Sequence, residues 1–90
     1  IILINNYMLG TIRMHQEKNY PKRKIATDLT NPNFKSLCKG YNAHYENIKN
    51  HKHFKNALDR CIKSNKASVI EIEIDPQQIT TRQKLKDFHN

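Results

Sequence analysis

The chain opens on an uninterrupted apolar run, residues 1–4, that leads directly into an asparagine pair, Asn5 and Asn6. A continuous apolar run predicts a strand buried on both faces in a parallel sheet, because strands with one wet face alternate in polarity. In open α/β sheets, ligands bind just beyond the carboxyl ends of such strands. Carboxamides at that place can offer oxygen ligands to a hard cation or hydrogen bonds to a phosphate. These residues therefore predict either a ligand-binding loop or a plain turn, in which asparagine is also common.

Helical patterns recur further along the chain. Apolar residues at helical spacing predict a helix that begins with Asn31 as its N-cap and Pro32 at its first position, and that ends near Gly40. A second apolar stripe predicts an amphipathic helix over residues 54–62. Helix-like content also predicts a helix over residues 7–18.

Strand patterns lie between and after these helices. Strict alternation over residues 69–74 predicts a strand with its isoleucines inward, so that Glu71 and Glu73 form a solvent-facing row. Weaker patterns predict a short strand over residues 43–48 and a last helix or an arm over residues 79–88. The whole order predicts one α/β domain over residues 1–90, a parallel sheet with flanking helices and right-handed crossovers. Strands at its edges would be open to pairing with another chain.

Composition restricts the partners of the chain. A formal net charge of +8 raises nucleic acid or an anionic membrane as a partner. The chain is crowded with Lys, Asn and Ile, which A/T-rich codons favour, so we expect much of this charge to be compositional. The longest apolar run has four residues, too few to span a membrane, and we expect no signal peptide. We therefore expect a cytoplasmic protein that does not engage a membrane.

The cysteines and histidines give little support for a metal site. Cys38 and Cys61 lie far apart without a CxxC pair, so we expect buried, reduced thiols. His51 and His53, with His44 nearby, are the best candidates for zinc ligands. No Cys pair or HExxH motif accompanies them, and we expect a solvated helix start instead.

Four segments together resemble a known family. The stretch Asn-Asn-Tyr-Met-Leu-Gly-Thr-Ile-Arg-Met-His-Gln-Glu, residues 5–17, resembles the second half of the thiamine diphosphate-binding motif. The resemblance is strongest to the acetolactate synthase and 2-oxo-acid decarboxylase group. It continues through residues 27–34, 40–44 and 69–76, in the expected order, and so covers nearly the whole chain. It implies the C-terminal portion of a three-layer, Rossmann-like thiamine diphosphate-binding fold.

This resemblance implies a definite site. In the family, Mg²⁺ anchors the diphosphate and is held by an Asp side chain, an Asn side chain, a backbone carbonyl and phosphate oxygens. The Asn ligand corresponds to Asn6, and the carbonyl ligand corresponds to Met8. The backbone at Leu9 and Gly10 would lie beside the diphosphate. Tyr7 and Met8 replace the small residues, often glycine, found in many relatives, so their bulk could crowd the site.

The resemblance also implies that important parts lie outside these 90 residues. The Gly-Asp-Gly element with its Asp ligand is not in the chain, nor is the pyrimidine-binding domain whose glutamate activates the cofactor. We therefore expect a fragment with negligible turnover alone, which needs the missing N-terminal part or a homo-oligomeric partner. The complete enzyme would act on 2-oxo acids.

Two further interpretations compete with this one at particular residues. His15, Gln16 and Glu17 follow the asparagine loop and either face a substrate cavity or form a polar helix surface, which we favour. The basic run at residues 22–24, beside Tyr20, could hold a phosphate and stack a base. It would then belong to a non-catalytic basic module that binds nucleic acid or a protein partner. No nucleic-acid-binding motif accompanies this run, so a solvated loop is expected.

Overall fold

The computed structural model describes residues 1–88, which form two compact units. We call the first the sheet unit; it contains Ile1–Asn5 and Asn31–Glu73. We call the second the helical unit; it contains Asn6–Thr30 and the described residues from Ile74 onward. Each unit is described by itself.

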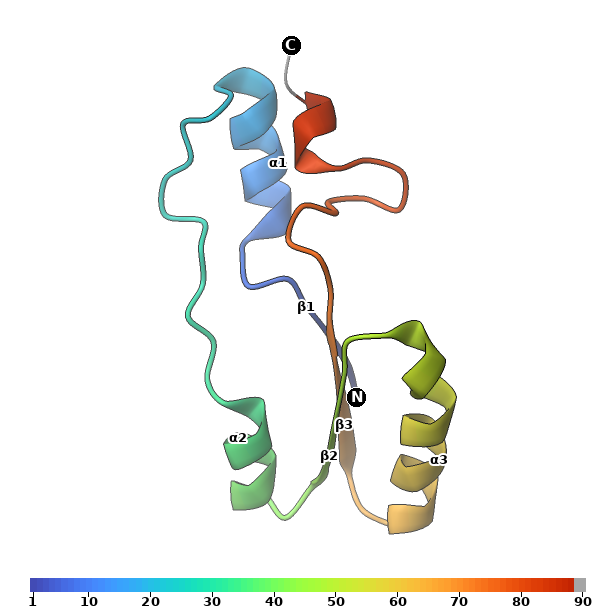
Figure 1. Ribbon diagram of the computed structural model, residues 1–90. Coiled ribbons are helices and arrows are strands. Elements are labelled where there is room, and N and C mark those ends of the chain that lie inside the picture. Colours follow the sequence, from blue (N-terminus) through green and yellow to red (C-terminus); the bar gives the residue numbers. More distant parts are fainter. Residues whose placement is uncertain (89–90) are drawn as a thin grey trace. The chain divides into compact units, whose positions relative to one another are not determined.

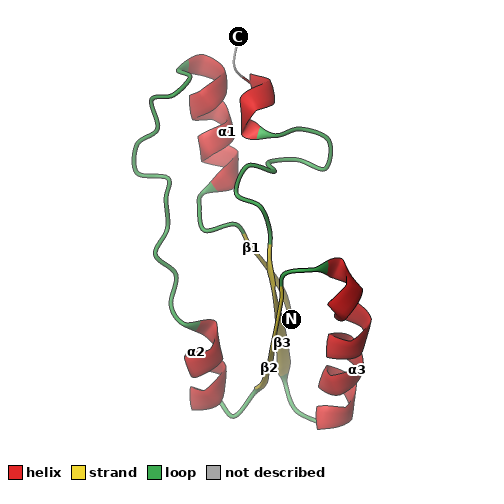
Figure 2. Ribbon diagram, viewed as in Figure 1, coloured by secondary structure: helices red, strands yellow, loops and turns green. Residues whose placement is uncertain are grey.

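The sheet unit contains a parallel three-stranded sheet. Strands β1 (Ile2–Asn5), β3 (Ser68–Glu73) and β2 (His44–Ile48) lie in the order β1-β3-β2, with β3 in the centre (Figure 1). Helices α2 (Phe34–Gly40) and α3 (Phe54–Ser64) cover opposite faces of this sheet (Figure 2). The α/β class, the parallel sheet and its flanking helices are therefore as the sequence predicted.

Helix α3 packs on one face of the sheet and forms the main apolar core. Ala57 and Cys61 of the helix lie against Ile48 and Ile70 of the strands. The register pairs Ile48 with Ile72, so isoleucines from two strands share this face. The helix ends at a left-handed Asn65, as a C-cap requires. The apolar stripe thus predicted α3 correctly, and Cys61 is a buried free thiol, as is Cys38 on α2.

The first strand is less buried than its apolar run predicted. β1 is an edge strand, and Ile2 and Ile4 are 54% and 57% exposed. A shallow groove of about 360 Å³ lies beside this edge, and its lining includes Ile2, Leu58 and Ile62. The prediction of burial on both faces is therefore wrong for β1, because the core beneath α3 is formed with Ile48 of β2 and Ile70 of β3, and no described residue of the edge strand belongs to it.

The face of the sheet opposite α3 carries a buried polar network. Glu71 is 6% exposed, so its prediction as a solvent-facing residue is wrong. Asn5 donates its amide to one Glu71 oxygen at 2.7 Å, and the Tyr45 hydroxyl donates to the other at 2.5 Å. Asn31 in turn donates to the Asn5 side-chain oxygen at 2.9 Å. A buried carboxylate is costly unless it is hydrogen-bonded, and these donors meet that requirement.

Helix α2 begins later than the sequence predicted. Its N-cap is Asn33, whose side chain accepts from the Ser36 N–H at 3.0 Å. Asn31, the predicted cap, is instead committed to Asn5. Gly40 is the last helical residue, as predicted, but the left-handed residue beyond it is Asn42.

The helical unit contains α1 (Gly10–Asn19) and a 3₁₀ turn, Leu85–Phe88, packed against it. The prediction of a last helix or an arm is realised as this single turn, with Leu85 buried. Glu17 is almost fully buried on α1 and pairs with Arg13 at 2.7 Å. Its other oxygen accepts from the Lys22 N–H at 3.1 Å, so the carboxylate ties the end of α1 to the turn that follows.

The Tyr45 hydroxyl can be tested without a change of side-chain shape. Tyr45→Phe removes one of the two donors to the buried Glu71 carboxylate. We expect it to lower the free energy of unfolding by about 1–3 kcal/mol, measured by urea denaturation. Tyr41→Phe is the matched control, because Tyr41 is 81% exposed and should change stability little. Equal effects of the two variants would contradict this role of the hydroxyl.

Tyr45 also provides a spectroscopic check on the same network. Burial, and then the hydrogen bond to Glu71, raise the pKa of Tyr45 from 10.0 to about 12. Because the folded state favours the neutral phenol, its contribution to stability is complete below pH 10 and is lost as the pH rises through about 12. An ultraviolet titration should show a late phenolate step that disappears in Tyr45→Phe; persistence of that step would assign it elsewhere.

A second pH dependence concerns Glu46 on β2. The hydrogen bonds from Arg60 on α3 lower the pKa of Glu46 from 4.5, and His44 adds to this effect. The stabilisation is therefore present above pH 4.5 and is lost as the pH falls below it. We expect Arg60→Met to lower the urea midpoint at pH 7 and the difference to shrink in acid. Lys63→Met, an exposed change on the same helix, should show no such pH dependence.

Candidate cofactor-binding loop

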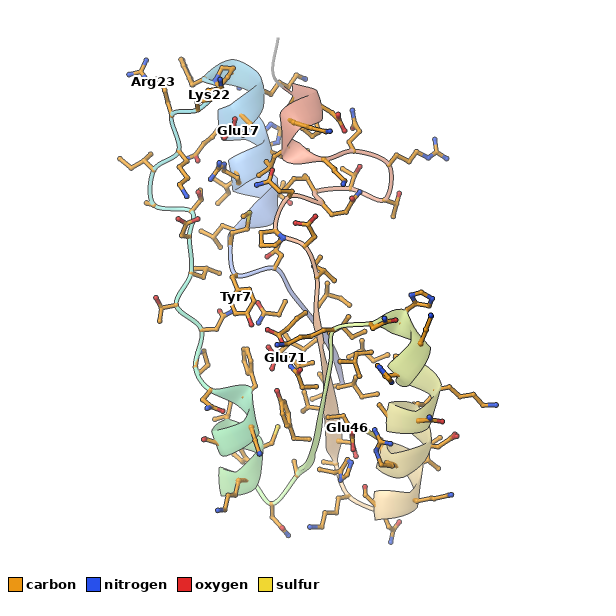
Figure 3. The ribbon with its side chains drawn as sticks, in the orientation of Figure 1. Tyr7, Glu17, Lys22, Arg23, Glu46 and Glu71 are labelled. Carbon is orange, nitrogen blue, oxygen red and sulfur yellow. The ribbon has the colours of Figure 1, made fainter. Side chains whose placement is uncertain are left out.

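A tight loop within the helical unit contains Asn6, Met8 and Leu9 and ends where α1 begins at Gly10. The Asn6 side-chain oxygen accepts from the Met8 N–H at 3.2 Å. Tyr7 lies between them and is labelled in Figure 3. Its φ is 61°, in the left-handed region. That conformation suits glycine, so a tyrosine here stores strain of about 1–2 kcal/mol. Glycine would adopt this conformation without that strain.

A short antiparallel bridge holds the loop from one side. The Leu9 N–H donates to the Thr27 carbonyl at 2.8 Å, and the Leu29 N–H donates to the Tyr7 carbonyl at 2.8 Å. Met8 and Asp28 are thus the non-hydrogen-bonded pair of the bridge. The N–H and carbonyl of such a residue point away from the partner segment. Among the described residues, none donates a hydrogen bond to the Met8 carbonyl.

Gly10 leaves room for the Asn6 side chain. A Cβ at Gly10 would lie 2.8 Å from the Asn6 Nδ2 atom, which is closer than real Cβ contacts allow. The glycine is not needed for its backbone angles, since its φ is not positive. It is needed because the Asn6 carboxamide lies against the first residue of α1.

The start of α1 is not capped by the chain itself. Leu9 at the N-cap position makes no side-chain hydrogen bond, and the first turn holds no acidic residue. The first N–H groups of a helix have no acceptor within the helix and carry a partial positive charge. Such a helix start favours a phosphate or another anion. Helix α2 differs, because Asn33 caps it.

The bridge brings one acidic residue, Asp28, opposite Met8. It is exposed and pairs with Lys24 at 2.8 Å, and the hydrogen bond from Lys24 lowers the pKa of Asp28. The loop therefore offers neutral oxygens from Asn6 and Met8, while this carboxylate already has a cationic partner.

The predicted polar helix surface at residues 15–17 is not formed. His15 is exposed, but Glu17 is buried with Arg13. Gln16 donates to the Ile25 carbonyl at 2.9 Å and lies 3.4 Å from the Thr27 hydroxyl. The sequence analysis did not predict a role for Thr27 in holding this loop. Its place at the start of the resembling segment 27–34 was the one available signal.

The structure also places the histidines and the basic run named above. Residues 44, 51 and 53 belong to no group of three metal-ligating side chains within residues 1–88. Lys22 and Arg23 lie in an exposed turn after α1, as a solvated loop does (Figure 3). No helix in the described part of the chain has the length and apolar character needed to cross a membrane.

The chain combines a parallel α/β sheet with a loop after the first strand and a helix start without a side-chain cap. Domains that bind phosphorylated cofactors commonly place the ligand after such a strand and at such a helix start. The comparison with protein families is specific. The family described as "Thiamine pyrophosphate enzyme, C-terminal TPP binding domain" matches residues 1–72, and the chain belongs to this family. The match confirms the predicted membership of the thiamine diphosphate-binding family. No curated protein matches the chain.

Gly10 permits a test of the loop that separates geometry from stability. Gly10→Ala should displace the Asn6 side chain while favouring the helix, since alanine exceeds glycine in helix propensity by about 1 kcal/mol. We expect large NMR shift changes at Asn6 and Met8 with little loss of thermal stability. Gly40→Ala is the matched control, because open space surrounds that position. Unchanged Asn6 and Met8 signals in Gly10→Ala would contradict the contact.

Proposed function

We propose that this chain is the diphosphate- and Mg²⁺-binding part of a thiamine diphosphate-dependent enzyme of the acetolactate synthase or 2-oxo-acid decarboxylase kind. Family membership supports the cofactor. The observation that carries the proposal is the loop itself, in which Asn6 and Met8 present oxygens immediately before an uncapped helix start.

The residues of the loop fit both parts of the ligand. Mg²⁺ prefers oxygen ligands, and the Asn6 carboxamide and the Met8 carbonyl supply two. The Met8 carbonyl points away from the bridge, and the Asn6 oxygen retains a second lone pair beside its bond to the Met8 N–H. The N–H groups at the start of α1 suit the diphosphate. When bound, thiamine diphosphate supplies the carbanion-stabilising ring that 2-oxo-acid chemistry requires.

These residues bind and orient; they do not complete a catalyst. Two neutral oxygens leave Mg²⁺ without a protein carboxylate, and Mg²⁺ sites in proteins usually include at least one. The remaining ligand and the acid that activates the cofactor would come from the N-terminal part of the enzyme or from a second copy. The purified chain should therefore show negligible decarboxylation of 2-oxo acids, and steady turnover by the 90 residues alone would refute this division.

Binding can be measured on the chain as it is. Thiamine diphosphate with Mg²⁺ should shift the amide NMR signals of residues 6–12 at millimolar concentrations. Asn6→Ala should weaken this binding by about tenfold or more, as the loss of a ligand or its supporting group does at metal sites. Asn56→Ala, an exposed change on α3, is the matched control and should bind as the wild type does.

The outcomes discriminate clearly. Saturable shifts confined to residues 6–12 support the proposed site. Equal binding by Asn6→Ala and the wild type would exclude Asn6 as a ligand. Absence of any binding by the wild type would overturn the proposed function for this chain.

A further inference from the structure

The shape of the cofactor-binding loop depends on contacts from outside it. Tyr7 has left-handed backbone angles, which an L-residue adopts only when the surrounding structure enforces them. The Asn6–Met8 hydrogen bond lies within the loop and spans only two residues. The bridge acts on both flanks of Met8, because the Leu29 N–H holds the Tyr7 carbonyl and the Thr27 carbonyl holds the Leu9 N–H.

The bridging segment is itself anchored at Thr27. This side chain is 2% exposed, one of the most buried in the protein. Its carbonyl oxygen accepts the Leu9 N–H, so any shift of Thr27 moves the residue next to Met8. Its hydroxyl lies 3.4 Å from the Gln16 side-chain oxygen.

Gln16 connects this segment to α1. Its amide nitrogen donates to the Ile25 carbonyl at 2.9 Å, while its oxygen faces the Thr27 hydroxyl. Both polar ends of the carboxamide are thus engaged with the segment that forms the bridge. The Gln16 carboxamide therefore ties this segment to α1.

We propose that Gln16 and Thr27 are positioning residues that hold the bridge and so keep Asn6 and the Met8 carbonyl presented to a bound cation. This inference rests on the proposed function. Gln16 holds the bridging segment against α1 through its hydrogen bonds with Ile25 and Thr27. That segment in turn holds the loop, because Thr27 accepts from Leu9 and Leu29 donates to Tyr7.

Gln16→Met tests the idea with little change in volume or helix propensity. The Ile25 carbonyl it leaves behind can turn to water, since Ile25 is 74% exposed, so the chain should still fold. We expect hydrogen exchange of the Leu9 and Leu29 amides to accelerate by about fivefold, the loss of one typical net hydrogen bond. The dissociation constant for thiamine diphosphate with Mg²⁺ should rise by a similar factor.

Two comparisons distinguish positioning from a general loss of stability. Lys18→Met, an exposed change on the same helix, should leave both readouts unchanged. Thr27→Ser keeps the hydroxyl and should retain Leu9 protection better than Thr27→Val does. In all variants, amides of β3 and α3 should exchange as in the wild type, because only the bridge is affected.

The results decide both proposals separately. Local loss of Leu9 and Leu29 protection with weaker binding supports the positioning role. Unchanged protection in Gln16→Met, or an equal increase in exchange across the whole chain, overturns it. If the wild type binds no cofactor, the proposed function fails, while the exchange data on the ligand-free chain still decide whether Gln16 and Thr27 hold the loop.

Discussion

A buried carboxylate must be hydrogen-bonded, and meeting that need at Glu71 organises the sheet unit. Its two oxygens take donors from Asn5 on β1 and Tyr45 on β2, so the central strand is tied to both neighbours by side chains as well as by the backbone ladder. Asn31 donates to the Asn5 oxygen and thereby fixes the orientation of that carboxamide. Because the oxygen is occupied, the amide must turn toward Glu71.

The two adjacent asparagines have different structural roles. Asn5 is 5% exposed and serves the buried network of the sheet. Asn6 is half-buried and shapes the turn through the Met8 N–H, with Gly10 leaving the space it occupies. The resembling segment contains both asparagines, but only Asn6 belongs to the loop before α1.

Much of the fold could be predicted from the sequence, because the relevant signals are local. An apolar stripe was sufficient to predict α3, and the alternation of strands with helices was sufficient to predict a parallel sheet. Alternation along β3 showed that its two faces differ, but it could not show that both are covered, and Glu71 was misplaced for that reason. The choice of Asn33 over Asn31 as a helix cap likewise depends on Asn5, which is far away in sequence.

Asn6, Met8, Leu9 and Gly10 could be named as candidates from the family resemblance. The contact between Thr27 and Gln16 could not be predicted, because it joins residues eleven apart through an irregular segment.

The isoleucines on the outer side of β1 affect how the chain behaves in solution. Ile2 and Ile4 are exposed on a strand at the edge of the sheet, and such an edge is a template for another strand. Any polypeptide that pairs there binds the folded form and not the unfolded one, and so stabilises it by mass action. Where a second copy of the chain is the partner, the unfolding midpoint would rise with protein concentration.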